Sequence, residues 1–285
     1  MPHVPHPAPG TAAARRRLLV AGNWKMNGNR ALARSLALAA KAAADAAPGV
    51  DVAVFPPFPL LGVVAEALAL PDGRAAMGGQ TCHAEESGAH TGSVSAAMLV
   101  ETGCTRVLVG HSEVRREWSQ DDEGVRGSTR AAIAAGLRPI VCVGETRAER
   151  DAGRAREVVE RQLRAVVHEI GHGAGNLDVA YEPVWAIGTG LQATPVEVRE
   201  AHGWIRATLD AAGGERARIL YGGSVNRANI GGFLSEPVVD GVLVGGQSLD
   251  PAAFTSLVEA ARVESERSSA DTSPAAGNPA LRRRP

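Results

Sequence analysis

Short apolar runs alternate with longer amphipathic stretches along most of this chain. Each run spans only a few residues and is nearly continuous in apolar side chains, which is typical of strands buried on both faces of a parallel sheet. The runs begin at Leu18, Val52, Ala75, Arg106, Arg138, Asp178, Ala217 and Asp240. The pattern therefore predicts eight parallel strands separated by helices.

Two of the intervening stretches have clear helical signals. Apolar residues recur at spacings of three and four between Val158 and Ile170, which gives a helix one apolar face. Further on, Thr194, Pro195 and Glu197 supply a hydroxyl cap, a proline with a suitable φ and a carboxylate for a helix N-terminus. We expect a helix in both stretches.

Eight strand–helix units without an evident boundary favour one closed (β/α)8 barrel, a TIM barrel, because closure pairs every strand edge. The alternative is an open doubly wound sheet. In such a sheet a glycine-rich dinucleotide turn should follow the first strand, where this chain has Asn23, Trp24 and Lys25. We therefore expect an α/β protein with a single barrel domain.

The two ends of the chain differ from the part between them. Residues 1–17 are rich in Pro and Ala, and residues 264–285 in Ser, Pro, Ala and Arg, without apolar periodicity in either. We expect both to be disordered tails around a barrel domain at residues 18–263. The length of 285 residues suits one barrel, for which ~250 residues are typical.

Composition narrows the class of partner. The chain is 45% hydrophobic and 21% charged, as in a globular protein with a large core. It has 30 Lys and Arg against 31 Asp and Glu, so there is no global field to hold nucleic acid or an anionic membrane. An anionic ligand would need a local site.

Cysteine content and the N-terminus bear on the compartment. The three cysteines, Cys82, Cys104 and Cys142, are an odd number in a long chain, which argues against a disulfide framework. Residues 1–17 lack the apolar segment of a signal peptide, and no apolar run approaches the ~20 residues of a membrane span. We expect a cytoplasmic protein without a membrane contact.

Polar side chains follow several of the predicted strands. Asn23 and Lys25 follow the first strand, His111 the fourth and Glu182 the sixth. In a barrel of this type the C-terminal strand ends meet at one mouth, where the active site lies. Each residue alone is a weak signal, but their occurrence at the same end of several strands predicts one site.

Glycine turns follow the last two predicted strands. They are Gly222-Gly223-Ser224 and Gly245-Gly246. Glycines let backbone N–H groups approach an anion closely, and barrel enzymes bind phosphate at this place. The turns therefore indicate a phosphorylated substrate.

Four segments together resemble the signatures of the triosephosphate isomerase family, in the family's order. The resemblance extends over about residues 18–263. The segments are Asn23-Trp24-Lys25-Met26-Asn27, Gly110-His111-Ser112-Glu113, Ala180-Tyr181-Glu182-Pro183-Val184-Trp185-Ala186-Ile187-Gly188-Thr189-Gly190 and Tyr221-Gly222-Gly223-Ser224-Val225.

The resemblance implies the interconversion of glycerone phosphate and D-glyceraldehyde 3-phosphate, a reaction of glycolysis and gluconeogenesis, without a cofactor or a metal and in a homodimer. It makes Glu182 the catalytic base, a neutral His111 the electrophile, and Lys25 a catalytic and substrate-binding cation. The remaining substrate-binding residues would be Asn23, Gly188, Ser224, Gly245 and Gly246. The segment from Pro183 to Thr194 would be a mobile lid that excludes water.

The loop around Thr91, which the resemblance places at the dimer interface, departs from the family pattern. Ser93 stands where glutamate is usual, and His90 where an aromatic residue is usual. Val114 and Gln120 replace an arginine and a glutamate. Losing one partner of a charged network would leave a buried charge unpaired, whereas losing three together avoids that cost. We infer a coordinated rewiring that affects the dimer contact rather than the chemistry.

Leu191 is a further departure, because lysine is common at this lid position, and the change bears on lid closure. Two other functions stay open. One is isomerisation of a four-carbon ketose phosphate (a tetrulose phosphate), because one extra carbon unit is often worth only ~1–3 kcal/mol in a pocket. The other is a noncatalytic scaffold on a retained barrel, because fold alone does not establish function. The joint presence of Glu182, His111 and Lys25 argues against the scaffold.

Overall fold

The structure is a computed structural model that describes residues 16–69, 74–187 and 191–271. Within these residues, parallel strands β1 to β8 form a closed barrel in sequence order, and β8 pairs with β1. The strands are β1 Leu18–Asn23, β2 Val50–Phe55, β3 Ala75–Gly79, β4 Arg106–Val109, β5 Arg138–Val143, β6 Asp178–Tyr181, β7 Ile219–Tyr221 and β8 Gly241–Val244. The predicted (β/α)8 barrel is confirmed.

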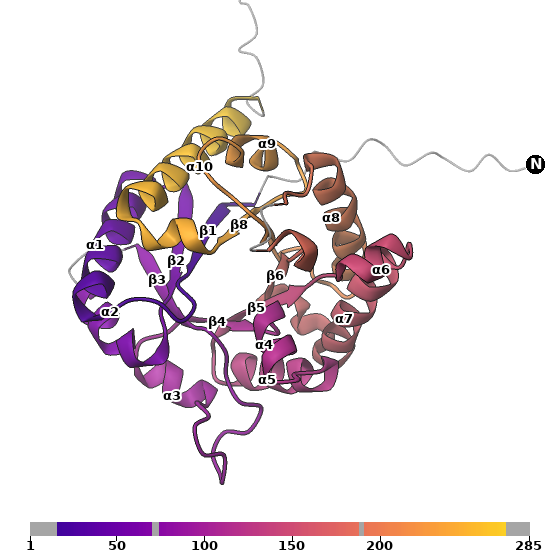
Figure 1. Ribbon diagram of the computed structural model, residues 1–285, viewed down its shortest axis with the longest axis horizontal. Coiled ribbons are helices and arrows are strands. Elements are labelled where there is room, and N and C mark those ends of the chain that lie inside the picture. The colour runs from indigo at the N-terminus through magenta and orange to yellow at the C-terminus, as the bar shows by residue number, and fades with distance from the viewer. Residues whose placement is uncertain (1–15, 70–73, 188–190, 272–285) are drawn as a thin grey trace, which may run out of the picture.

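Helices surround the barrel on its outer side (Figure 1). The α-helices are α1 Arg30–Ala46, α2 Leu61–Leu68, α3 Ala96–Glu101, α4 Ser112–Glu117, α5 Asp122–Ala134, α6 Arg147–Asp151, α7 Ala155–Ile170, α8 Pro195–Asp210, α9 Ile230–Leu234 and α10 Pro251–Asp271. Short 3₁₀ turns are η1 Phe58–Leu60, η2 Gly171–Asn176, η3 Val184–Ala186 and η4 Gly246–Leu249.

Strand side chains alternate between two apolar layers. In β1, Leu19 and Ala21 belong to a cluster that includes Leu108 and Ile140 from other strands. Their neighbours Leu18 and Val20 belong to a larger cluster that also contains buried helix residues. Both faces of the strand are therefore buried, which explains why the strand sequences are continuous apolar runs rather than alternating ones.

Both predicted helices are present. In α7 the apolar face from Val158 onward is buried, and Ile170 packs partly buried against the same core. In α8 the Thr194 side chain accepts from the Glu197 N–H while the Glu197 carboxylate accepts from the Thr194 N–H, with Pro195 in the first turn. This reciprocal cap fixes the start of α8 directly after the predicted lid.

The predicted N-terminal tail is too long by two residues. Arg16 Nε donates to the Glu215 carbonyl at 2.9 Å, and Arg17 Nη2 donates to the Pro48 carbonyl at 2.7 Å. These contacts attach both arginines to the barrel. The rest of this tail prediction, residues 1–15, lies outside the described residues.

The predicted C-terminal tail also begins too early, because α10 continues through residues 264–271. One charged pair joins this segment to the preceding helical turn, because Arg262 binds Glu266 at 2.5 Å. A polar stretch of this kind lacks apolar periodicity and yet forms a helix. Residues 272–285 lie outside the described residues.

A buried carboxylate joins the N-terminal ends of four neighbouring strands, β4 to β7. Asp178 is fully buried at the start of β6 and pairs with Arg106 at 3.0 Å, Arg138 at 2.7 Å and Arg218 at 3.2 Å. Burial by itself would raise the pKa of Asp178, but these guanidinium groups hold it well below its usual range. The carboxylate is therefore a structural anchor away from the barrel mouth.

Cys82, Cys104 and Cys142 are free and buried. Among the described residues, no helix combines the length and the apolarity that crossing a membrane requires.

Candidate active site

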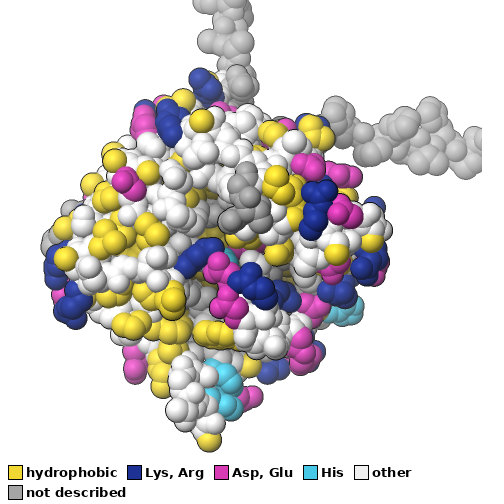
Figure 2. Space-filling model, viewed as in Figure 1, with side chains coloured by type: hydrophobic (Ala, Val, Ile, Leu, Met, Phe, Trp, Pro, Cys, Tyr) yellow, Lys and Arg dark blue, Asp and Glu magenta, His cyan; other side chains and the backbone are white. Residues whose placement is uncertain are grey.

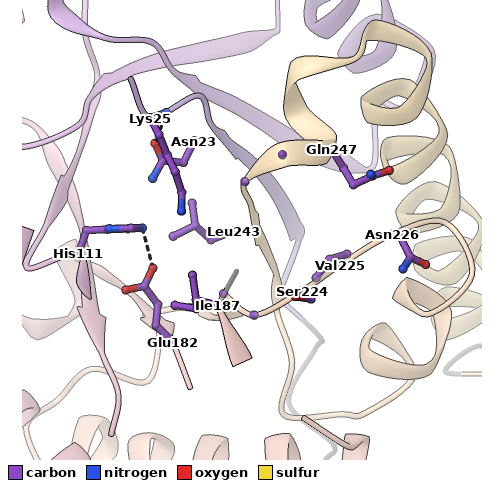
Figure 3. Close-up of a pocket in the computed structure, with 14 residues that line it drawn as sticks. Asn23, Lys25, His111, Glu182, Ile187, Ser224, Val225, Asn226, Leu243 and Gln247 are labelled. Atoms are coloured by element: carbon purple, nitrogen blue, oxygen red, sulfur yellow. Dashed lines mark hydrogen bonds and ion pairs between the residues drawn. The ribbon is translucent and has the colours of Figure 1, made fainter. Parts of the chain in front are cut away.

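The predicted site residues that the structure describes line one cavity of about 350 Å³ at the C-terminal strand ends. These residues are Asn23, Lys25, His111, Glu182, Ser224, Gly245 and Gly246. Figure 3 shows the side chains of Lys25, His111 and Glu182 facing a common space, and Leu243 and Ile187 are apolar residues of its wall. Gly188 lies outside the described residues, so its predicted contact with phosphate is not placed.

A strained turn places Lys25 at the cavity. Its φ is 52°, a left-handed conformation that costs a residue other than glycine of order 1 kcal/mol. Two hydrogen bonds hold the turn: Lys25 N–H donates to Asn23 Oδ1 at 3.0 Å, and Gln80 Nε2 donates to the Lys25 carbonyl at 2.8 Å. Strain maintained in this way favours a functional reason for the side chain's direction.

The Lys25 ammonium is paired before any substrate binds. Its Nζ lies 2.6 Å from Glu113 Oε1, and both side chains are about one-third exposed, at 29% and 34%. Figure 2 shows dark blue and magenta side chains next to one another near the centre of this face, where the barrel opens. Because the pair is partly solvated, an anionic substrate can compete for the ammonium at modest cost.

The two residues that the sequence predicts as base and electrophile are in direct contact. His111 Nε2 lies 3.1 Å from Glu182 Oε1, and both side chains are buried (Figure 3). Burial by itself would lower the pKa of His111, but the nearby Glu182 carboxylate, with a smaller contribution from Glu113, raises the pKa overall.

The other ring nitrogen identifies the tautomer. His111 Nδ1 accepts a hydrogen bond from the Glu113 N–H at 3.2 Å, at the start of α4. A nitrogen that accepts cannot carry a proton, so the single proton of the neutral ring lies on Nε2 and points to Glu182. Protonating Nδ1 would break this hydrogen bond. The cost of breaking it opposes the increase in the pKa of His111 that the Glu182 carboxylate causes. We therefore assign the neutral form.

Three groups stabilise the Glu182 carboxylate in its charged form. Burial by itself would raise the pKa of Glu182, but His111, the Ser112 N–H and Lys25 lower it overall. The Ser112 N–H donates to Oε2 at 3.0 Å. A carboxylate that stays ionised at neutral pH can act as a base.

A glycine lets the chain pass close to the base. A Cβ on Gly222 would lie 2.9 Å from Glu182 Cγ, which is closer than a side chain tolerates. Ser224 Oγ donates to the Ala186 carbonyl at 3.1 Å, which ties the turn after β7 to the start of the predicted lid. Among the described residues, no group of three or more His, Cys, Asp or Glu could hold a metal ion.

Glu145 is a residue near the site to which sequence reasoning assigned no role. It follows β5 and is fully buried, and it accepts from Tyr181 OH at 3.1 Å, Trp185 Nε1 at 2.8 Å and Arg150 Nη1 at 2.8 Å. Trp185 is part of the predicted lid, so this carboxylate fixes the lid's N-terminal end. The only signal in the sequence is its position two residues after the end of β5.

The remaining lid residue singled out by the sequence is Leu191, whose side chain is exposed at 51%. An exposed leucine in place of a lysine removes a cation from this segment.

Three of the four departures at and near the Thr91 loop come together in space. Ser93, Val114 and Gln120 line one cavity of about 260 Å³, next to the exposed side chain of Trp118. The loop between β3 and α3 projects from the barrel on this side (Figure 1). These three positions are distant in sequence but lie around one cavity. The inferred joint loss of a charged network requires such proximity, because its members have to contact one another.

Comparison with known proteins agrees with the geometry. The family model described as triosephosphate isomerase matches residues 18–261. A triosephosphate isomerase of Afipia carboxidovorans is 51% identical over 247 residues, covering 86% of this chain and 97% of that protein. One of Halorhodospira halophila is 49% identical over 251 residues, covering 86% and 98%.

A solved structure gives the same answer for the fold. The crystal structure of triosephosphate isomerase from Bartonella henselae superposes with a TM-score of 0.78 at 36% identity, covering 86% of this chain and 99% of that one. The family match spans nearly the whole barrel, and the strand ends carry the expected side chains. The chain belongs to the triosephosphate isomerase family.

Proposed function

We propose that this protein interconverts glycerone phosphate and D-glyceraldehyde 3-phosphate by moving a proton through an enediol(ate). The observation that carries the proposal is the contact between the Glu182 carboxylate and the His111 imidazole at a cavity that also holds Lys25. A proton next to a carbonyl needs one base to remove it and one donor for the charge that develops on oxygen.

In the proposed reaction Glu182 takes a proton from one carbon of the substrate and returns it to the neighbouring carbon. His111 Nε2–H donates to the substrate oxygens as they gain charge. The two side chains bind each other in the absence of substrate, so each must exchange this partner for the substrate. Lys25 and Asn23 bind the substrate's oxygens from the first strand.

The substrate's phosphate binds, in this proposal, at the turns after β7 and β8. Ser224, Gly245 and Gly246 border the same cavity as the base, and their backbone N–H groups are the donors. Gly188, outside the described residues, completes this set. No step requires a cofactor, because a carboxylate, an imidazole and an ammonium supply every proton and charge.

The segment from Pro183 to Thr194 closes over the substrate in this proposal. Its two ends are well anchored, through Trp185 to Glu145 and through the Thr194–Glu197 cap. Closure excludes water, which protects an enediol phosphate from loss of its phosphate group.

We further propose a cytoplasmic homodimer with the Thr91 loop at the interface. Two large apolar side chains on the surface support this, since Met26 is 94% and Trp118 66% exposed. The projecting loop offers a segment that a second copy can receive. Light scattering at micromolar concentration tests the proposal: the mass of two chains is expected, and the mass of one chain would refute it.

The chemical step is tested by running the reaction in D₂O. Glu182 can return the same proton before it exchanges with solvent, so the mixture is left to equilibrate over many turnovers. Even occasional exchange of the proton held by Glu182 then places deuterium on carbon, whereas a hydride shift never does. Carbon that is still free of deuterium after prolonged equilibration would overturn the enediol route. Both relatives described above are named triosephosphate isomerase. This favours the triose phosphate reaction over the four-carbon reaction and over a noncatalytic scaffold.

A further inference from the structure

One short turn carries groups that bear on both proposed reacting residues. Gly110, His111 and Ser112 follow β4; His111 supplies the imidazole, and the Ser112 N–H binds the Glu182 carboxylate at 3.0 Å. The turn has little freedom to move, because Gly110 has φ 71° and a Cβ there would lie 2.7 Å from Val125 of α5. A small movement of this turn would displace donor and base together.

Arg115 contacts this turn at two successive carbonyls. Its side-chain Nε donates to the Gly110 carbonyl at 2.9 Å, and its backbone N–H donates to the His111 carbonyl at 2.9 Å. The side chain is only 16% exposed. It borders the same cavity of about 290 Å³ as Ser112 and Glu182, and it does not line the proposed substrate cavity.

The guanidinium is in turn fixed by two helices of the outer layer. Arg115 Nη1 lies 2.7 Å from Asp122 Oδ1, at the start of α5, and Arg161 Nε of α7 donates to Asp122 Oδ2 at 3.1 Å. Figure 1 shows α4 directly beside α5. The turn is thus connected through one arginine to helices that do not border the substrate cavity.

We propose that Arg115 is a positioning residue for the isomerase reaction, which holds the turn from Gly110 to Ser112 so that His111 and Glu182 keep their alignment. The inference rests on the proposed function. Reacting groups need to be held within about 0.5 Å, and a misplacement of about 1 Å can reduce a rate about 100-fold. Arg115 does not have to touch the substrate to have this effect.

The chain provides a matched control in the next residue. Arg116 is on the same helix and borders the same cavity, but it is 67% exposed and its guanidinium pairs with Glu117 at 2.6 Å. Arg115→Met and Arg116→Met remove the same charge from α4, and only the first removes the contact with Gly110. Arg115→Lys keeps the charge but not the two-pronged guanidinium.

The experiment compares kcat and KM of these variants and of Asp122→Asn on triose phosphate. We expect Arg115→Met to lower kcat by about 10- to 100-fold with KM changed by less than about threefold, and Arg115→Lys and Asp122→Asn to lie between it and the wild type. Arg116→Met should keep the wild-type kcat. Wild-type kcat in Arg115→Met, or an equal loss in both methionine variants, would overturn the inference.

A spectroscopic readout separates this inference from the proposed function. The His111 Nε2 proton, hydrogen bonded to Glu182, gives a downfield ¹H NMR resonance. It should shift or broaden in Arg115→Met and stay in place in Arg116→Met, and no change in either would refute positioning even if the wild type does not turn over triose phosphate. If Arg115→Met fails to fold, the same resonance is measured in Asp122→Asn instead. An inactive wild type refutes the function alone.

Discussion

His111 Nε2 and Glu182 Oε1 lie 3.1 Å apart, although β4 and β6 are separated in the barrel by β5. A buried imidazole and a buried carboxylate thus satisfy each other in the absence of substrate. The contact lowers the cost of burying both groups, and it must be exchanged for contacts with the substrate during the reaction. The following predictions depend on this pair and on the scaffold that holds it.

Glu182→Gln removes the base and leaves an amide oxygen that can still accept from the Ser112 N–H. We expect kcat to fall by about 10²–10⁴-fold with the fold intact, because a neutral amide cannot take up the substrate's proton. Steady-state kinetics and circular dichroism measure the two effects. Glu66→Gln, on the outer surface, is the control. Wild-type turnover in Glu182→Gln would contradict the mechanism.

His111→Ala removes the donor that faces the developing oxyanion. We expect kcat to fall by about 10²–10³-fold, the usual effect of deleting one well-aimed donor, with a smaller change in KM. His168→Ala, at an exposed position of α7 that does not line the substrate cavity, serves as a control. If His111→Ala changed only KM, the imidazole would bind substrate without stabilising the transition state.

Sequence patterns predicted the barrel because its strands are buried on both faces and so appear as continuous apolar runs. The end of α10 was not predicted, because residues 264–271 have no apolar periodicity and continue a helix whose apolar side chains lie earlier, such as Phe254 and Leu257. The ion pair between Arg262 and Glu266 links the two parts of the helix.

The mouth residues could be predicted from their position after strands, since barrel closure brings strand ends together. Their partners could not be predicted in the same way. Glu145 and Arg115 act through contacts that depend on how the outer helices pack, and the sequence near each contains no pattern that specifies this. Whether His111 touches Glu182 likewise depends on strand register and side-chain rotamers.

Asp178→Asn tests the anchor at the N-terminal strand ends. Removing the charge leaves three arginines without their buried partner, so we expect the free energy of unfolding to fall by about 3–5 kcal/mol. Because the pKa of Asp178 is lowered in the fold, its contribution is present above about pH 4 and is lost as the pH falls further. Urea unfolding measures the change.

The exposed residue Asp45, which pairs with Lys41 within α1, gives the comparison. Asp45→Asn should change the free energy of unfolding by less than about 1 kcal/mol. An equally small effect of Asp178→Asn would mean that its arginines are stabilised by solvent rather than by this carboxylate.

His202 in α8 predicts a second dependence of stability on pH. Burial lowers the pKa of this histidine to about 4, whereas an unfolded chain has about 6.5. Between these values the unfolded state binds more protons, so stability rises with pH across the window, by about 3 kcal/mol for this group. We expect His202→Gln to have a smaller loss of stability than the wild type from about pH 7 to pH 4. The same loss in both proteins would contradict the assignment.

The central claim is that this protein turns over a triose phosphate. A coupled assay of D-glyceraldehyde 3-phosphate, run beside a four-carbon ketose phosphate at matched concentration, tests the claim most directly. We predict efficient triose turnover, with kcat/KM approaching about 10⁸ M⁻¹s⁻¹, and much weaker turnover of the longer sugar. Feeble triose activity with good four-carbon activity, or no activity with either, would contradict the claim.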